Sequence, residues 1–253
     1  MSRPSPPNKL QRQALAEETR DLIPGVIGAT INPPTDHQRP TISVWNSDSF
    51  TAAETILRAN PTARIGVLNM ASERHPGGGW LRGALAQEEA LCFRSTLART
   101  LHMRYYPLPQ FGAIWSPQVT VFRGEVSSWC QLYAPAEMFT VGVVSLPALR
   151  RPALTPDKKE FANPGTIHVV KDKIRQVLRV LATNHVTHCV LGAMGCGAFQ
   201  NPVSEVVRAY KEVLDEAEWN GAFEEIVFAV LDTRGESNHE VFKDMLEENA
   251  SSG

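Results

Sequence analysis

The sequence is poor in cysteine and has almost no net charge. Its four cysteines, Cys92, Cys130, Cys189 and Cys196, form no CxxC pair, so their spacing suggests neither a disulfide framework nor a zinc cluster. We therefore expect reduced thiols in an intracellular protein. The formal net charge is −2, from 25 basic and 27 acidic residues, which argues against a broad electrostatic attraction to DNA or to an anionic membrane.

Long apolar runs are also missing. No stretch approaches the ~18 residues of a membrane span, and the first residues, MSRPSPPNKLQRQ, lack the apolar centre of a signal peptide. We expect a cytoplasmic or nuclear protein, and the sequence does not choose between the two. The 253 residues fit one α/β domain or two small ones. Hydrophobic residues make up 43% and charged residues 21%, a composition typical of a soluble globular protein.

Strand and helix signals alternate along the chain. β-branched and apolar segments predict strands at 41–45, 64–70, 112–122, 138–146, 188–192 and 225–232. Helix formers and helical periodicity predict helices at 9–21, 49–59, 84–100, 166–183, 202–218 and 238–248. This alternation predicts one α/β sandwich with a largely parallel sheet.

Other segments read as irregular. Residues 1–8 and 249–253 are expected to be disordered, which leaves 9–248 as a single domain. Ser49 or Thr51 is expected to cap the second helix. The segment 147–164 contains four prolines, and an irregular stretch of this length often forms a lid or a mobile flap.

Two glycine-rich loops, 71–83 and 193–201, each follow an apolar strand and lead into a helix. Ligands of open α/β sheets bind at the carboxyl ends of strands, so these loops are candidate walls of one site. The first loop carries Gly77, Gly78 and Gly79, and the second has Gly192 at its start with Gly195 and Gly197. Loop amides beside a helix N-terminus suit a diphosphate, although a plain tight turn explains a glycine triplet equally well.

Glu88 and Glu89 begin the helix after the first loop. Acidic residues favour helix N-terminal turns, so a solvated pair is one interpretation. Neighbouring helical residues project about 100° apart, so the two cannot both flank one glycosidic bond as the carboxylates of ordinary glycosidases do. In a functional site one would grip ribose hydroxyls. The other would act as a general acid, its pKa raised by burial and by the neighbouring charge.

Several other side chains have two interpretations each. Phe199 could stack on a ribose or base, or pack into the core. Asn69 could reach a sugar hydroxyl or cap its own loop. His75 is a candidate ligand contact, and Asp48 with the residues around Trp45 is a candidate for the adenine end. His185, His188 and Cys189 do not indicate a metal site, because Cys189 should point into the core, and we find no Ser/His/Asp or Cys/His catalytic set.

The chain resembles a known family at the glycine triplet. Gly77–Gly79, seven further residues and then Gln87-Glu88-Glu89 resemble the signature of poly(ADP-ribose) glycohydrolases. The segments NMASERHPGGG, AQEEALCFRSTL, LGAMGCGAFQNP and EIVFAVLD resemble the microbial (bacterial and fungal) type, a macrodomain family, and the likeness extends from about residue 9 to 246. It implies a three-layer α/β/α macrodomain with a mixed, largely parallel central sheet.

The resemblance also implies roles for individual residues. Glu89 would protonate the leaving oxygen of the ribose–ribose O-glycosidic bond and then assist the attacking water, while Glu88 would bind ribose hydroxyls. The glycine triplet would lie against the ribose and diphosphate. The other implied ligand contacts are Asn69, Gln87, Gly195, Cys196, Gly197, Ala198 and Phe199, with Phe199 on the distal ribose. No metal or other cofactor is implied.

The implied partners are ADP-ribose, poly(ADP-ribose) and ADP-ribosylated proteins, in a DNA damage response, and we expect a monomer. Two alternatives stay open: a hydrolase of single ADP-ribose units on protein or nucleic acid, and a non-catalytic ADP-ribose reader. A chance glycine loop in an unrelated nucleotide-binding protein is a weaker third. Trp80 and the proline-rich segment depart from the familiar pattern.

Overall fold

The computed structural model describes residues 39–232 and 237–247. Our expectations for 1–8, 9–21 and 249–253 lie outside these residues. The described strands are β1 (Thr41–Trp45), β2 (Ile65–Met70), β3 (Ile114–Val121), β4 (Phe139–Leu146), β5 (His188–Leu191) and β6 (Glu225–Ala229). They form one sheet in the order β1-β6-β5-β2-β4-β3. Every pairing is parallel except that of β3 with β4, which confirms the predicted mixed, largely parallel sheet.

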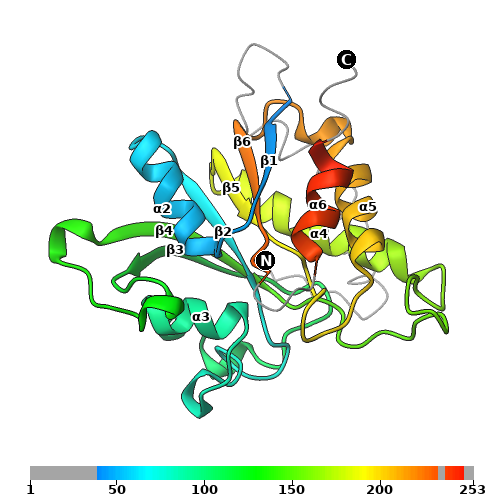
Figure 1. The fold of residues 1–253 in the computed structure, drawn as a ribbon, viewed down its shortest axis with the longest axis horizontal. Coiled ribbons are helices and arrows are strands. Elements are labelled where there is room, and N and C mark those ends of the chain that lie inside the picture. The colour runs from blue at the N-terminus through cyan, green and yellow to red at the C-terminus, as the bar shows by residue number, and fades with distance from the viewer. Residues whose placement is uncertain (1–38, 233–236, 248–253) are drawn as a thin grey trace, which may run out of the picture.

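Helices cover both faces of the sheet (Figure 1). The α-helices are α2 (Ser49–Ala59), α3 (Gln87–Arg94), α4 (Thr166–Thr183), α5 (Val203–Leu214) and α6 (Asn238–Glu247). Residues of α2 and α3 share one buried cluster with the sheet, and residues of α4, α5 and α6 share the other. The two cores on opposite faces confirm the three-layer arrangement.

Six short 3₁₀ helices lie in the connections of the described chain. They are Trp80–Arg82, Leu97–Arg99, Met103–Tyr105, Val126–Ser128, Pro135–Glu137 and Ala217–Trp219. The third precedes β3, so the segment between α3 and the sheet edge is built from tight turns rather than from a continued helix.

The predicted helix 84–100 is wrong at both ends. Ala86 is extended (φ −135°, ψ −170°), so α3 starts at Gln87, and Ser95 is extended again (φ −147°, ψ 178°). Ser95 leaves the helix because it bridges to Val121 of the sheet. Within α3 the side chains of Leu91 and Cys92 are buried, whereas those of Ala90 and Phe93 are half-buried.

Two other helix ends differ from the sequence prediction. Asp48, and neither Ser49 nor Thr51, caps α2, because its carboxylate accepts hydrogen bonds from the amides of Phe50 (3.0 Å) and Thr51 (3.1 Å). The helix predicted at 202–218 begins after Pro202 and ends at Leu214. A separate 3₁₀ turn follows it.

The proline-rich segment 147–164 is anchored to the rest of the molecule. Phe161 is buried in the core formed with α4 and α5, and it bridges to Leu154. The Arg151 amide donates a hydrogen bond to the Phe199 carbonyl (2.8 Å). The segment therefore lies beside the second glycine-rich loop.

Both edges of the sheet are interrupted. On β3 the register shifts between Ser116 and Val119, and the exposed Pro117 between them has no amide hydrogen to offer. On β1 the Val44 amide donates to the Glu247 carboxylate at the end of α6 (2.8 Å). Among the described residues, no helix is long and apolar enough to cross a membrane.

Candidate active site

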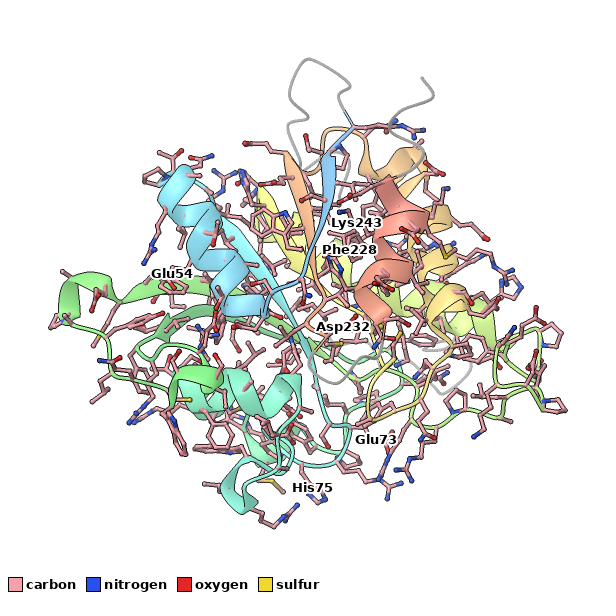
Figure 2. All side chains as sticks on the ribbon, in the orientation of Figure 1. Glu54, Glu73, His75, Phe228, Asp232 and Lys243 are labelled. Carbon is pink, nitrogen blue, oxygen red and sulfur yellow. The ribbon has the colours of Figure 1, made fainter. Side chains whose placement is uncertain are left out.

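The candidate site lies at the carboxyl ends of the two central strands. β2 and β5 are parallel neighbours, so the loops that follow them emerge at the same edge of the sheet. α3 starts from this edge with Glu88 and Glu89 in its first turn. Figure 2 labels Glu73 and His75 on the loop after β2, and Lys243 on α6 away from it.

Glu88 and Glu89 are both buried, with 4% and 9% of their surface exposed. The Glu88 carboxylate accepts the Ser72 amide (2.7 Å) and lies 3.5 Å from the Asn69 side-chain amide. The Glu89 carboxylate accepts the amides of Gly79 (2.8 Å) and Ala86 (3.0 Å). This burial excludes the solvated acidic pair, and the separate partners of the two side chains agree with separate jobs.

The electrostatics of the pair are unequal. Burial, with a smaller contribution from the Glu89 charge, raises the pKa of the Glu88 carboxyl from 4.5 to about 7. We expected such a shift for the general acid, which the resemblance assigns to Glu89. The shift falls instead on Glu88, the side chain expected to bind the ribose hydroxyls.

The glycine triplet wraps around these carboxylates. Gly77 and Gly78 have left-handed backbone angles (φ 68° and 60°). A Cβ atom on Gly78 would lie 2.3 Å from the Glu89 carboxylate, and one on Gly79 would lie 2.8 Å from the Ala84 methyl group. The loop therefore needs glycine both for its conformation and for its close approach to the glutamates, which is more than a plain tight turn requires.

Asn69 extends the polar wall below Glu88. Its side chain is fully buried, and its amide nitrogen donates to the Ser145 hydroxyl on β4 (2.9 Å). Its side-chain oxygen has no partner among the described residues. A buried acceptor left without a partner is uncommon and marks a place where a ligand or water hydroxyl fits.

Tyr106 is a residue that the sequence analysis missed. Its hydroxyl is buried without a partner in the described part of the chain, and burial together with the Glu88 and Cys92 charges raises its pKa. Burial and the two glutamates likewise raise the pKa of the Cys92 thiol to about 12. Nothing in the local sequence distinguishes Tyr106 from its neighbour Tyr105, because the tertiary fold alone brings it to Glu88.

Gln87 fastens the helix to the sheet. Its side-chain oxygen accepts the Met70 amide (2.9 Å), and its nitrogen donates to the Leu68 carbonyl (2.6 Å) and to the Ser49 hydroxyl (3.1 Å). Both hydrogens of its amide are thus used inside the protein. These contacts fix the start of α3 against the end of β2, and the expected ligand contact of Gln87 stays a prediction.

The second loop is held by a buried asparagine. Asn201 is 4% exposed, and its nitrogen donates to the carbonyls of Leu149 (2.7 Å) and Gly195 (3.0 Å). A Cβ atom on Gly195 (φ 77°) would lie 2.4 Å from that nitrogen. The sequence analysis missed Asn201, although its place just before Pro202 at the end of the loop was a usable signal.

The remaining predicted residues of this loop differ in exposure. Phe199 and Cys196 are half-buried and pack against the core, so Phe199 combines a core contact with an exposed part. Gly197 and Ala198 are exposed, and no atom lies within 4 Å of a Cβ placed on Gly197. The tip of the loop therefore has open space in front of it.

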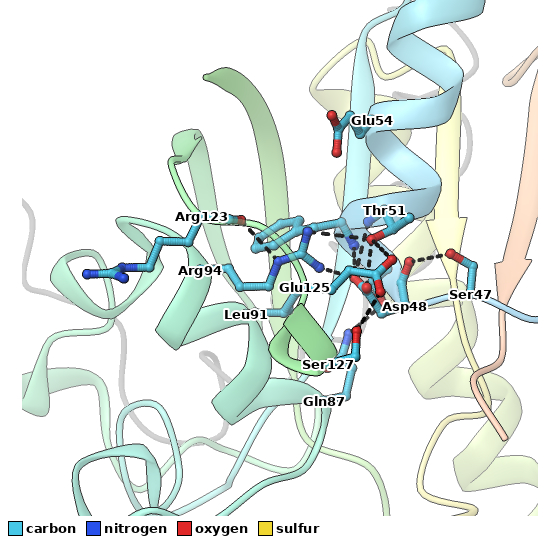
Figure 3. A network of polar contacts seen from close by, with 12 residues as sticks. Ser47, Asp48, Thr51, Glu54, Gln87, Leu91, Arg94, Arg123, Glu125 and Ser127 are labelled. Atoms are coloured by element: carbon cyan, nitrogen blue, oxygen red, sulfur yellow. Dashed lines mark hydrogen bonds and ion pairs between the residues drawn. The ribbon is translucent and has the colours of Figure 1, made fainter. Parts of the chain in front are cut away.

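Asp48 is engaged within the protein. Figure 3 shows Arg94, at the end of α3, reaching Asp48 and Thr51, with Glu125 beside them. The Arg94 side chain is 1% exposed and forms an ion pair with Asp48. Because Asp48 also caps α2, its carboxylate is occupied, which argues against its expected contact with adenine.

The other candidates stay outside the cluster. His75 is exposed on the first loop and Trp45 is half-buried at the end of β1. In the ranges that the structure describes, no three His, Cys, Asp or Glu side chains are placed to hold a metal ion. His185 and His188 accordingly join no such group.

Comparison with known proteins agrees with this geometry. The family model for the microbial-type PARG catalytic domain matches residues 9–124. The poly(ADP-ribose) glycohydrolase from Deinococcus radiodurans in complex with ADP-ribose is 31% identical, with 92% of each chain covered and a TM-score of 0.73. The chain belongs to the microbial-type poly(ADP-ribose) glycohydrolase family.

Two further structures of this family are similar. The enzyme from Thermomonospora curvata is 28% identical over 88% of this chain and 82% of its own, with a TM-score of 0.76. The same enzyme bound to the inhibitor ADP-HPD has a TM-score of 0.71, with 87% and 82% covered. No curated protein sequence matches the chain. Membership of the family places the paired glutamates and two glycine loops described above in a glycohydrolase fold.

Proposed function

We propose that this protein is a poly(ADP-ribose) glycohydrolase that cleaves the ribose–ribose O-glycosidic bond and releases ADP-ribose. The observation that carries the proposal is that the first glycine-rich loop holds two buried glutamates. The Gly79 amide donates a hydrogen bond to Glu89, and the Ser72 amide donates one to Glu88. The similar enzyme from D. radiodurans was solved with ADP-ribose, which supports ADP-ribose as the ligand here.

Glu89 is the proposed catalytic acid and base. It protonates the leaving ribose oxygen, an oxocarbenium-like sugar forms, and the resulting carboxylate then takes a proton from the attacking water. Glu88 and the unpartnered oxygen of Asn69 are the proposed acceptors for ribose hydroxyls. The loop formed by Gly195, Cys196, Gly197, Ala198 and Phe199 is the proposed wall for the diphosphate.

The domain bounds, the oligomeric state, the cellular location and the partners are also part of the proposal. We infer one catalytic domain over 9–248, acting as a monomer inside cells on poly(ADP-ribose) and ADP-ribosylated proteins. The four reduced cysteines support an intracellular setting. The two buried clusters flank one sheet, which supports a single domain.

The decisive experiment is hydrolysis of labelled poly(ADP-ribose) by the wild type, by Glu89→Gln and by Glu240→Gln. Glu89→Gln should lower turnover by at least ~100-fold because general acid help is lost. Its affinity for ADP-ribose, measured by calorimetry, should stay close to that of the wild type. Glu240 is exposed on α6, so Glu240→Gln controls for the loss of one negative charge.

Three outcomes would contradict the proposal. If the wild type releases no ADP-ribose from polymer but cleaves mono-ADP-ribosylated protein or nucleic acid, the protein is a mono-ADP-ribosyl hydrolase. If it binds ADP-ribose tightly without any turnover, it is a reader. If Glu89→Gln keeps nearly the full rate with an unchanged thermal unfolding midpoint, the role of Glu89 is wrong.

A further inference from the structure

A second concave feature lies along β3, outside the cluster around Glu88 and Glu89. We call it the β3 cavity; it has a volume of about 630 Å³ and is lined by parts of β3 and of the turns at 99–114, including Arg99, His102, Tyr105, Trp115 and Ser116. Small-molecule sites typically span about 300–1,000 Å³. The cavity is therefore large enough for one nucleotide.

The β3 cavity adjoins the proposed catalytic centre on one side. Leu108, in its wall, donates its amide hydrogen to the Glu73 carbonyl of the first glycine loop (2.8 Å). Ile114, also in its wall, is paired in register with Ser145, whose hydroxyl accepts from Asn69. Two residues in the wall of the cavity, Leu108 and Ile114, are thus connected to residues beside the glutamate cluster.

The order of the strands in the sheet indicates the direction in which a bound substrate extends. The proposed diphosphate loop follows β5, the glutamates lie after β2, and the sheet continues through β4 to β3. A substrate that runs from the diphosphate loop to the glutamates therefore points toward β3. The group on the far side of the cleaved bond would meet the β3 cavity.

The chemistry of the lining favours an anionic, aromatic ligand. No aspartate or glutamate lines the cavity, and within residues 39–232 and 237–247 no carboxylate lies within ion-pair distance of Arg99. Tyr105 packs edge-on against His102 (5.6 Å between ring centres), and Arg104 lies over the Tyr105 ring (5.0 Å). Guanidinium groups suit phosphates and aromatic rings suit adenine.

We propose that the β3 cavity binds the polymer's next ADP-ribose unit, the one on the leaving side of the cleaved bond. Arg99 contacts its diphosphate, and Tyr105 offers an edge for its adenine. This inference rests on the proposed function, because only a polymer substrate carries such a unit. It makes the cavity a specificity site for polymer over ADP-ribose itself.

The test separates the cavity from the catalytic centre. Arg99→Glu and Tyr105→Ala are compared with Lys243→Glu, a charge reversal on the exposed surface of α6. We measure kcat/KM on poly(ADP-ribose) at low and at high salt, the affinity for ADP-ribose by calorimetry, and the thermal unfolding midpoint. Arg99→Glu should lower kcat/KM on polymer by about tenfold at low salt and by less at high salt.

The expected pattern is loss on polymer with ADP-ribose affinity and unfolding midpoint unchanged, and no effect of Lys243→Glu. Equal loss of ADP-ribose affinity would place Arg99 in the catalytic site and overturn the inference. No loss on polymer would overturn it as well. Loss on mono-ADP-ribosylated protein without loss on polymer would instead assign the cavity to the acceptor polypeptide. A wild type inactive on polymer would sink the proposed function before any variant is compared.

Discussion

The adjacent side chains Glu88 and Glu89 accept hydrogen bonds from different parts of the same loop. Ser72, near its beginning, donates its amide hydrogen to Glu88 (2.7 Å), whereas Gly79, after the turn, donates to Glu89 (2.8 Å). The loop therefore closes over the first turn of α3 and fixes the direction of each carboxylate separately. A shift in the loop moves both glutamates, which makes the loop glycines sensitive positions.

Gly78→Ala should damage both stability and turnover. The new Cβ would lie 2.3 Å from the Glu89 carboxylate, at a residue with φ 60°. We expect a loss of about 1–3 kcal/mol in the free energy of unfolding. A displaced acid should cost about 100-fold in kcat.

Gly197→Ala is the matched control for stability. A Cβ there meets no atom within 4 Å, so denaturant unfolding should give nearly the wild-type value. A Gly78→Ala protein as stable and as active as the wild type would show that the loop does not position Glu89.

Glu88 should make stability depend on pH. Because its pKa is raised from 4.5 to about 7, the folded protein holds the proton more tightly than the unfolded chain does. Ionising the buried carboxyl therefore costs stability as pH rises from about 4.5 through about 7, and above pH 7 the penalty is complete. Glu88→Gln cannot ionise and escapes this cost.

The measurement is denaturant unfolding of the wild type and of Glu88→Gln at pH 5 and pH 8. The variant should gain about 2 kcal/mol relative to the wild type between the two pH values. Glu240→Gln, at an exposed position, should show no such gain. A constant difference between wild type and Glu88→Gln at both pH values would contradict the raised pKa.

Arg94 and Arg39 should differ sharply although both form ion pairs with aspartate. Arg94 is 1% exposed and pairs with Asp48, whereas the side chains of Arg39 and Asp215 are 71% and 56% exposed. Arg94→Met should lower the free energy of unfolding by about 3 kcal/mol, because it leaves a partly buried carboxylate without its partner.

Arg39→Met should change the free energy of unfolding by less than about 1 kcal/mol. Both variants can be measured by urea unfolding under identical conditions. Similar values for the two would mean that the network in Figure 3 does not stabilise the start of α2 or the end of α3.

Asn201→Ala should weaken ligand binding indirectly, although Asn201 is not a proposed ligand contact. The side chain holds the carbonyls of Leu149 and Gly195 together, so its loss releases the proposed diphosphate loop. We expect ADP-ribose affinity to fall by about tenfold, because the binding-competent loop becomes less populated. Asn220→Ala, at an exposed position, should leave calorimetric affinity unchanged. Unchanged affinity in Asn201→Ala would show that the loop holds its shape without this contact.

Sequence patterns predicted the bounds of a helix or strand correctly where no long-range contact opposed the local preference. The strand at 41–45 and the helices at 49–59 and 166–183 have the predicted bounds. The length of α3 was wrong because Ser95 bridges to Val121, a partner 26 positions away that no local pattern reveals. Tertiary pairing overrode helix propensity at that point.

The site was predicted in outline and not in its supporting contacts. The two glycine loops and the two glutamates were identified from strand ends and from the resemblance, and the structure brings the glutamates together with the first loop. The anchoring contacts of Gln87 to Met70 and Leu68 were not predicted, because a signature names residues without showing what they touch. Tyr106 and the β3 cavity depend on contacts between segments far apart in the chain, so the sequence held little signal for them, whereas the place of Asn201 before Pro202 was a usable signal.

The interrupted sheet edges have a consequence for how many copies can work together. A long polymer gathers enzyme molecules on one strand at high local concentration, where exposed strand edges would pair and aggregate. Pro117 with the shifted register on β3, and Glu247 covering the Val44 amide on β1, interrupt the edges at which such pairing would begin. These two features therefore make edge-to-edge pairing between crowded copies less favourable.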